Sequence, residues 1–308
     1  MRRPVSNSNK MTPSGQKFKP TRVLRLLILA VVASWFGVVL YGALSVTMGL
    51  TVPLKGTVCC LEEPHEDVHF QTADGLTLSG WYVAPKNGAV IILFHAYYGD
   101  RRQTLPIAQM LVRHGYGVLM YDQRASGESQ GEVRSLGWLD IPDARQAVAF
   151  AQSRPGVDKK RIGVYGCSMG GAIALAAAAG NPSIAAVAAD AASPLTFGEA
   201  RPQVGDPGWE FNLPVTALYY SFVALRAWTL PPTTTLAAAQ AIAPRPLLLI
   251  SSGESGERAR VAALYNLAGE PKTHWNIPEA GHCGGPSIRP AEYEQRLVDF
   301  FNSSLLKP

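Results

Sequence analysis

Metal and disulfide chemistry have little basis in this sequence. It holds four cysteines in 308 residues, at positions 59, 60, 167 and 283, which is too few for a disulfide framework in a chain of this size. No Cys-x-x-Cys pair with histidines at zinc spacing occurs, so a structural metal is not expected. A thiol nucleophile at Cys167 is not expected either, because its side chain would point away from the tip of the turn described below.

Acidic residues are missing from the first 25 positions, which hold seven of the 28 basic residues. The rest of the chain carries 21 basic and 23 acidic residues, so the net positive charge of the protein comes from its N-terminal tail. We therefore expect no nucleic-acid binding by the body of the protein.

Charge is also absent between residues 26 and 54, where nearly every residue as far as Met48 is apolar. About 20 such residues span a bilayer as a helix, and the positive charges before them place the N-terminus in the cytoplasm and the body on the far side. The expected organisation is a disordered basic tail (1–22), a transmembrane anchor (23–50), a linker (51–65) and one large domain (66–303). A cleaved signal peptide, which would leave a secreted protein, is the alternative.

Strand and helix patterns alternate through the large domain. Buried strands are predicted over 90–94, 118–121, 162–165, 184–189, 247–250 and 273–277, and helices over 104–114, 139–153, 172–179 and 292–301. This alternation predicts an α/β fold with a mainly parallel sheet and helices on both faces. A polar–apolar alternation around Asp74-Gly75 predicts a hairpin.

The alternation breaks between residues 193 and 243, where one helix is predicted over 215–230 among proline- and glycine-rich stretches. Two interpretations stay open for this region. It is either a lid over the C-terminal edge of the sheet or a core helix with loops.

The most informative stretch is Gly166-Cys167-Ser168-Met169-Gly170, which follows a predicted strand and precedes an alanine-rich helix. A serine on a tight strand-to-helix turn needs neighbours without side chains two residues before and after it, and both positions are glycine. The helix that begins there also offers free N–H groups to a developing negative charge. We predict that Ser168 is a nucleophile.

A serine nucleophile needs a base and an acid that orients the base. His282 is the best base, because it follows the last predicted strand on a short loop. The acid is expected after strand 247–250, where no aspartate stands. We choose Glu254, which is closest to the strand end, with Glu257 as the runner-up and Asp190 as a third choice.

The negative oxygen of a tetrahedral intermediate needs hydrogen-bond donors. The N–H of Met169 is one expected donor, and the N–H of Tyr97, in the loop after strand 90–94, is the other. The side chains of Tyr97 and Tyr98 would line an acyl pocket or simply pack. His95, in the same loop, suits a role in shaping it. The turn over 122–129 is expected to be structural, stabilised by Asp122 and Arg124.

These pieces together resemble the α/β-hydrolase superfamily, and within it the membrane-anchored serine hydrolases of the dienelactone-hydrolase and serine-aminopeptidase-like branches. The similar segments, in the family's order, are Asp74-Gly75-Leu76-Thr77-Leu78 with Gly80-Trp81, His95-Ala96-Tyr97-Tyr98-Gly99, Asp122-Gln123-Arg124-Ala125-Ser126-Gly127, the serine pentapeptide and Gly281-His282. The resemblance covers about residues 66–303 and implies an α/β-hydrolase fold with a Ser–acid–His triad and no cofactor. Two departures are Ala96 in place of the usual glycine and Ser251-Ser252-Gly253-Glu254-Ser255 in place of the usual Gly-x-x-Asp.

The resemblance implies hydrolysis of ester, thioester or amide bonds through an acyl-enzyme at Ser168. We expect a carboxylesterase or lipase-like enzyme rather than a peptidase, acting on small or lipid-derived acyl substrates. The membrane, through the N-terminal helix, is the other expected partner. The alternatives are an acyltransferase that uses the same acyl-enzyme, or a catalytically silent binding or scaffold protein at the membrane.

Overall fold

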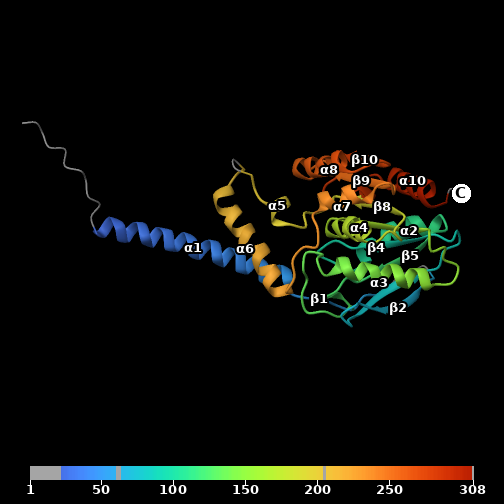
Figure 1. Ribbon diagram of the computed structural model, residues 1–308, viewed down its shortest axis with the longest axis horizontal. Helices are drawn as coiled ribbons and strands as arrows, with labels where there is room; N and C mark the ends of the chain where they lie inside the picture. The colour runs from blue at the N-terminus through green and yellow to red at the C-terminus, as the bar shows by residue number, and fades with distance from the viewer. Residues whose placement is uncertain (1–21, 60–63, 204–205, 307–308) are drawn as a thin grey trace, which may run out of the picture.

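The computed structural model describes residues 22–59, 64–203 and 206–306, so the predicted basic tail lies almost wholly outside the described residues. An eight-stranded sheet in the order β10-β9-β8-β7-β4-β5-β3-β2 forms the centre (Figure 1). Its strands are β2 Glu66–Gln71, β3 Thr77–Val83, β4 Val90–Phe94, β5 Gly117–Tyr121, β7 Ile162–Cys167, β8 Ala186–Asp190, β9 Leu247–Ser252 and β10 Lys272–Ile277. Strand β3 runs antiparallel to both neighbours, and the other neighbouring pairs are parallel.

Helices cover both faces of this sheet. The main ones are α2 Leu105–Arg113, α3 Asp140–Ser153, α4 Met169–Gly180, α7 Thr235–Ile242, α8 Ser255–Leu267 and α10 Pro290–Phe301. Helices α3, α4, α7 and α8 share one buried apolar cluster with the sheet, and α2 and α10 share the other. Shorter helical segments are η1 Arg101–Thr104, α5 Phe197–Ala200, α9 Gly285–Ile288 and η2 Asn302–Leu306. The predicted fold class, the order of its strands and helices and the hairpin at Asp74-Gly75 are confirmed.

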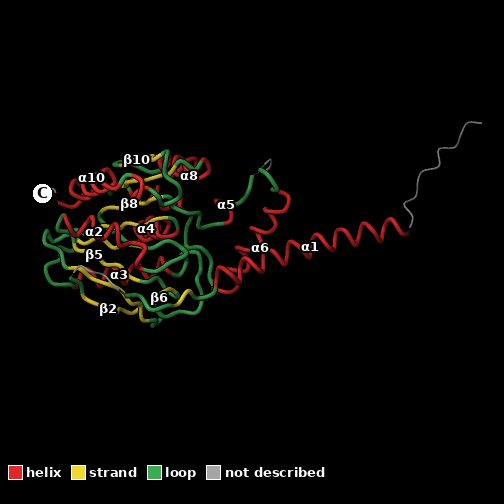
Figure 2. The backbone as a smooth tube through the Cα atoms, turned by 180° about the vertical axis from the view of Figure 1, so that it is seen from behind, coloured by secondary structure: helices red, strands yellow, loops and turns green. Residues whose placement is uncertain are grey.

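A long helix stands apart from the sheet layers in both views (Figures 1 and 2). This helix, α1 Arg22–Thr51, is long and apolar enough to cross a membrane. Most of it is exposed, but Val39, Ala43, Thr47 and Thr51 are buried. This four-residue spacing makes one face, and α1 packs against α6 Trp209–Ala227.

Helix α6 is the helix predicted over 215–230, although it starts and ends earlier in the chain. Its Val223 is buried in the apolar cluster that α3, α4, α7 and α8 share with the sheet. Tyr219, Tyr220 and Ala224 pack against the same cluster, so one face of α6 contacts the core, and the interpretation as a core helix with loops stays open. The same helix lies against the C-terminal part of α1, where a Cβ on Gly42 would stand 3.6 Å from Phe211. A lid function for residues 193–243 stays a prediction.

The segment after α1 is attached to the body over its described part. Strand β1 Leu54–Lys55 pairs in parallel with β6 Ser126–Gly127, and Val58 is buried in the cluster beneath α2 and α10. The first part of the predicted linker is therefore a fixed connection.

Candidate active site

The turn that carries Ser168 joins β7 to α4. Ser168 has φ 57° and ψ −120°, a backbone conformation that side-chain-bearing residues rarely adopt and that is common where function needs it. A Cβ on Gly166 would lie 2.2 Å from the backbone of Gly170, and one on Gly170 would lie 2.2 Å from the Phe94 carbonyl oxygen. Both glycines are therefore required for the close approach that holds the serine at the tip of this turn.

The structure brings Ser168 and His282 together, as the sequence predicts. His282 follows β10 on a short loop, and its Nε2 lies 2.8 Å from Ser168 Oγ. A second hydroxyl, Ser193 Oγ, lies 3.0 Å from Ser168 Oγ. Ser193 was not predicted, because it stands at the start of the region where the strand–helix pattern gives no guidance.

The carboxylate beside the imidazole is not the one that the sequence analysis chose. Glu257 Oε2 lies 2.6 Å from His282 Nδ1, and this side chain is only 2% exposed. Glu254 is exposed, and its Oε1 accepts the backbone N–H of His282 at 3.2 Å. The choice of Glu254 is therefore wrong as to geometry, and the runner-up occupies the position.

The start of α8 explains this difference. Glu254 is the residue before α8, whereas Glu257 lies in the first turn of that helix. From there the buried Glu257 side chain accepts the backbone N–H of Ser252 at the end of β9 and reaches the imidazole, while Glu254 stays exposed. Asp190, the third choice, is buried, and its Oδ2 accepts the hydroxyl proton of Tyr293 at 2.8 Å.

The electrostatics of this group favour an ionised carboxylate beside a basic imidazole. Burial would raise the pKa of Glu257, but hydrogen bonds from His282 and from the backbone N–H of Ser252 outweigh it and hold the pKa below its usual value. The hydrogen bond to Glu257 raises the pKa of His282 above 6.5. Burial raises the pKa of Asp190 to about 6.

A disulfide joins the chain neighbours of the two central residues. Cys167 precedes Ser168, Cys283 follows His282, and the two are bonded across 116 residues of sequence. The count of cysteines gave no reason to expect this bond. It links the serine turn directly to the histidine loop, so neither can shift far without the other.

The loop over residues 95–100, called the oxyanion loop below, faces the serine turn. Met169 is the first residue of α4, and neither its N–H nor that of Tyr97 donates a hydrogen bond within the described part of the chain. Both residues border a pocket of about 170 Å³ at Ser168. The predicted oxyanion role of the two N–H groups stays a prediction.

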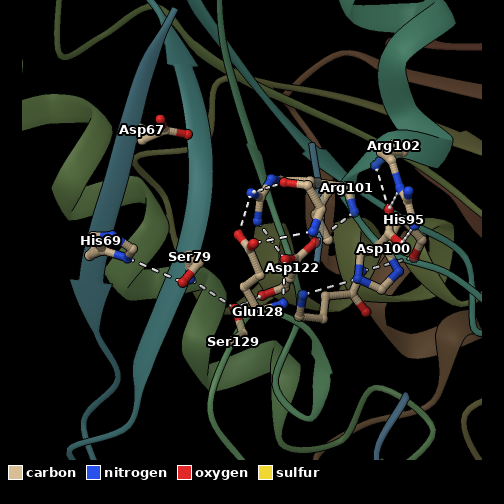
Figure 3. A network of polar contacts seen from close by, with 12 residues as sticks. Asp67, His69, Ser79, His95, Asp100, Arg101, Arg102, Asp122, Glu128 and Ser129 are labelled. Atoms are coloured by element: carbon tan, nitrogen blue, oxygen red, sulfur yellow. Dashed lines mark hydrogen bonds and ion pairs between the residues drawn. The ribbon is translucent and has the colours of Figure 1, made fainter. Parts of the chain in front are cut away.

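A buried polar network holds the start of the oxyanion loop (Figure 3). The Nε2 of His95 accepts the backbone N–H of Gln123 at 3.0 Å, and its Nδ1 lies 2.7 Å from the Ala96 carbonyl oxygen. Burial lowers the pKa of His95 to about 4, so this imidazole is neutral and both nitrogens are engaged. It is a structural histidine.

The neighbouring turn over 122–129 belongs to the same network. Asp122 Oδ2 pairs with Arg101 Nη1 at 2.5 Å, and both side chains are almost fully buried. Asp122 also accepts the backbone N–H groups of Arg101 and Glu128. Arg124, in the same turn, bonds to Asp143 and Asp74, so it fastens the turn to α3 and to the hairpin.

One group of side chains in the described residues is spaced closely enough to hold a metal ion. Single ligand atoms of Glu254, Glu257 and His282 all lie within 4.8 Å of one another. Glu257 and His282 are already hydrogen-bonded to each other, so a metal ion would have to replace that bond. The expectation of no metal and no cofactor stays a prediction.

Comparisons with known proteins agree with this architecture. Residues 74–219 match the family described as X-Pro dipeptidyl-peptidase (S15 family). The polyketide transferase grgF of a Penicillium species is 38% identical over 153 residues, which are 47% of this chain and 50% of that relative. The uncharacterized protein YfhR of Escherichia coli K12 is 28% identical over 255 residues, covering 78% of this chain and 81% of that one.

A solved structure, the esterase PF2001 of Pyrococcus furiosus, has the same fold. It superposes with a TM-score of 0.66 at 24% sequence identity, over 82% of this chain and 98% of that one. The chain thus spans about half the length of the polyketide transferase but nearly all of the esterase structure.

Proposed function

We propose that this chain, which has the α/β-hydrolase fold, is a serine hydrolase that works through an acyl-enzyme at Ser168. The observation that carries this proposal is the continuous hydrogen-bonded series from Ser168 Oγ to His282 to Glu257, which starts at a strained strand-to-helix turn. This is the arrangement that makes a serine hydroxyl a usable nucleophile.

In the proposed reaction His282 Nε2 takes the proton of Ser168 as Oγ attacks the carbonyl carbon of the substrate. The buried Glu257 carboxylate stabilises the imidazolium that forms and keeps Nδ1 protonated. The N–H groups of Met169 and Tyr97 are the proposed donors to the oxyanion. The imidazolium then protonates the leaving alcohol or thiol as its bond to carbon breaks, and water hydrolyses the acyl-enzyme by the same steps.

Ester or thioester substrates with a small or lipid-derived acyl group suit the pocket best. None of its lining residues is charged, and most are aromatic or aliphatic: Leu50, Tyr97, Tyr98, Leu136, Ser168, Met169, Ala172, Ser193, Pro194 and Tyr219. An apolar lining binds an acyl chain and offers no ion pair to the charged amino group of a peptide.

Acyl transfer is the second candidate function. It uses the same acyl-enzyme and differs only in the acceptor, and the name of the Penicillium relative is that of a transferase. A catalytically silent scaffold is disfavoured, because it would have no need for the buried Glu257 beneath the imidazole.

We place the sheet domain on the extracytoplasmic side of a membrane, with α1 as an uncleaved anchor. The disulfide between Cys167 and Cys283 supports this, because disulfides persist in oxidising compartments. The contacts that α1 makes with α6 support retention of the anchor over cleavage of a signal peptide.

A fluorophosphonate probe tests the proposal on the full chain in detergent micelles. Wild type should be labelled on the peptide that contains Ser168, Ser168→Ala should not be labelled, and Ser221→Ala, on the exposed surface of α6, should behave as wild type. A folded wild type that resists the probe would refute the hydrolase. Adding alcohol acceptors to an ester assay then separates transfer from hydrolysis by the product formed.

A further inference from the structure

The pocket at Ser168 is built in part from the anchor helix. Its walls come from the oxyanion loop through Tyr97 and Tyr98, from α6 through Tyr219, and from the last turn of α1 through Leu50. A helix that only held the protein at a membrane would have no reason to reach the nucleophile. Figure 1 shows α1 ending where α6 crosses it, at the edge of the sheet domain.

Two side chains fasten this last turn to the oxyanion loop. The hydroxyl of Tyr97 donates to the Leu50 carbonyl oxygen. Arg134 donates from its backbone N–H to the Thr51 carbonyl at 3.0 Å and from Nε to the Val52 carbonyl at 2.8 Å. The free carbonyls at the end of a helix carry partial negative charge, which favours a cation there.

Arg134 also contacts the oxyanion loop itself, through Tyr97. Its Nη1 donates to the Tyr97 carbonyl at 2.9 Å, and its guanidinium lies 4.5 Å from the centre of the Tyr97 ring. The residue is 5% exposed. One buried guanidinium therefore ties the end of α1 to the loop whose N–H is the proposed oxyanion donor.

The pocket lies close to the membrane surface when α1 spans a bilayer. About 20 helical residues cross the hydrocarbon core, which takes the span from Arg25 to about residue 45. At 1.5 Å per residue, Leu50 then lies about 8 Å beyond the hydrocarbon, at the outer edge of the headgroups. An acyl group held in the surface layer of the bilayer is within reach of Ser168.

We propose that Leu50 is a specificity-determining residue of the acyl pocket, and that the substrate is an amphiphilic ester or thioester that approaches from the membrane surface. This inference rests on the proposed function. The acyl group is short, because a dry apolar cavity of ~150 Å³ holds a benzene-sized molecule, and this pocket has about 170 Å³. Leu50 closes one wall and so limits the chain length.

Acyl-length profiles test the role of Leu50. The full chain in detergent micelles is assayed with p-nitrophenyl esters from acetate to decanoate, and the ratio of kcat/KM for octanoate to that for acetate is compared between variants. Leu50→Ala should raise this ratio about 10-fold or more and Leu50→Trp should lower it by a similar factor, since one methylene in such a pocket is worth ~10–200-fold. Leu44→Trp, exposed on the same helix, is the control and should keep the wild-type ratio.

Equal ratios for Leu50→Trp and Leu44→Trp would overturn the assignment of Leu50. Probe labelling of Ser168 is measured on every variant, so that loss of the nucleophile is distinguished from a change of acyl preference. A wild type that neither labels nor hydrolyses any ester would refute the proposed function itself, whereas an active wild type with unaltered ratios would refute the inference alone.

The approach of the substrate from the membrane is tested with two esters that have the same acyl group and differ in the alcohol. The full chain in lipid nanodiscs is given a hexanoyl ester of a membrane-partitioned alcohol or of a water-soluble alcohol of the same leaving-group pKa. The membrane-partitioned ester should have the higher kcat/KM by about 10-fold, because ~1.4 kcal/mol of favourable partitioning already supplies that factor. A preference for the soluble ester would overturn the membrane approach.

Discussion

Exchange of Glu257 for glutamine gives the sharpest test of the triad geometry. Glu257 Oε1 accepts the Ser252 N–H at 2.5 Å and Oε2 faces His282 Nδ1 at 2.6 Å. In Glu257→Gln the amide oxygen is expected to keep the Ser252 N–H, because only an oxygen can accept it. The amide NH₂ then faces Nδ1, which must become an acceptor, and the proton moves to Nε2.

An imidazole with its proton on Nε2 cannot accept the Ser168 proton. A change of tautomer of this kind costs ~10⁴ in kcat in serine proteases, so we expect Glu257→Gln to lose about 10³–10⁴ in kcat/KM, or ~4–5.5 kcal/mol of barrier. Glu254→Gln is the matched control. Its amide oxygen still accepts the backbone N–H of His282 from an exposed position, so its activity should stay close to wild type.

The pH profile supplies a second readout for the same pair of variants. Hydrolysis needs His282 unprotonated, so kcat/KM falls as the pH drops through its pKa, which Glu257 raises above 6.5. Without the carboxylate the largest of the effects that raise this pKa is lost, and burial is opposed only by the charges of Glu254 and Asp190. The residual activity of Glu257→Gln should therefore have its acid limb at lower pH than wild type. Ester hydrolysis between pH 5 and 9 measures both effects, with circular dichroism to show that each variant is folded. A larger loss in Glu254→Gln than in Glu257→Gln would refute the reasoning.

Three further predictions concern the frame of the site. Replacing both Cys167 and Cys283 with serine opens a 116-residue loop and should lower the free energy of unfolding, measured in urea, by about 2–4 kcal/mol. It should also lower kcat/KM by ~10²-fold, because misplacement of a catalytic group by 1 Å has that effect. Unchanged stability and activity would contradict this prediction. Gly170→Ala places a Cβ 2.2 Å from a backbone oxygen and should prevent folding. The control Gly256→Ala, in the first turn of α8, has no atom within 4 Å of its new Cβ and should gain up to ~1 kcal/mol of stability in thermal melts. Equal melting temperatures for the two variants would contradict the clash. Asp190→Asn should leave the rate of fluorophosphonate labelling of Ser168 unchanged, since Asp190 bonds Tyr293 and not His282; a rate as slow as that of Glu257→Gln would show that Asp190 acts in the triad.

The features that were predictable from sequence are those that short, contiguous sequence patterns determine. The Ser168 turn needs two glycines, a strand and a helix, all within about fifteen residues, and His282 follows a strand directly. Buried parallel strands read as continuous apolar runs. Each of these depends only on neighbours along the chain, so tertiary structure could not alter the outcome.

The features that were missed depend on contacts between distant segments or on the residue at which a helix begins. Distance along the chain favoured Glu254, but the first turn of α8 selects Glu257. Cys167 and Cys283 meet only because β7 and the loop after β10 converge at one edge of the sheet. The packing of α6 on α1, and the contact of Leu50 with the pocket, have no local signature, because both helices are apolar on several faces.

The short ladder between β1 and β6 has a consequence for what the enzyme can encounter. Only two residues separate α1 from β1, and the ladder is closed by the Leu54 N–H to the Ala125 carbonyl at 2.8 Å and the Gly56 N–H to the Gly127 carbonyl at 3.1 Å. A hydrolase on a slack tether would sweep a volume that grows with the length of the tether. Here the connection between α1 and the sheet domain is short and hydrogen-bonded. With α1 in a bilayer, the pocket therefore keeps a constant distance from the membrane surface and a constant orientation to it. For the proposed substrate, which approaches from the membrane surface, we expect the rate to follow the number of substrate molecules per unit area of membrane rather than their concentration in the surrounding solution.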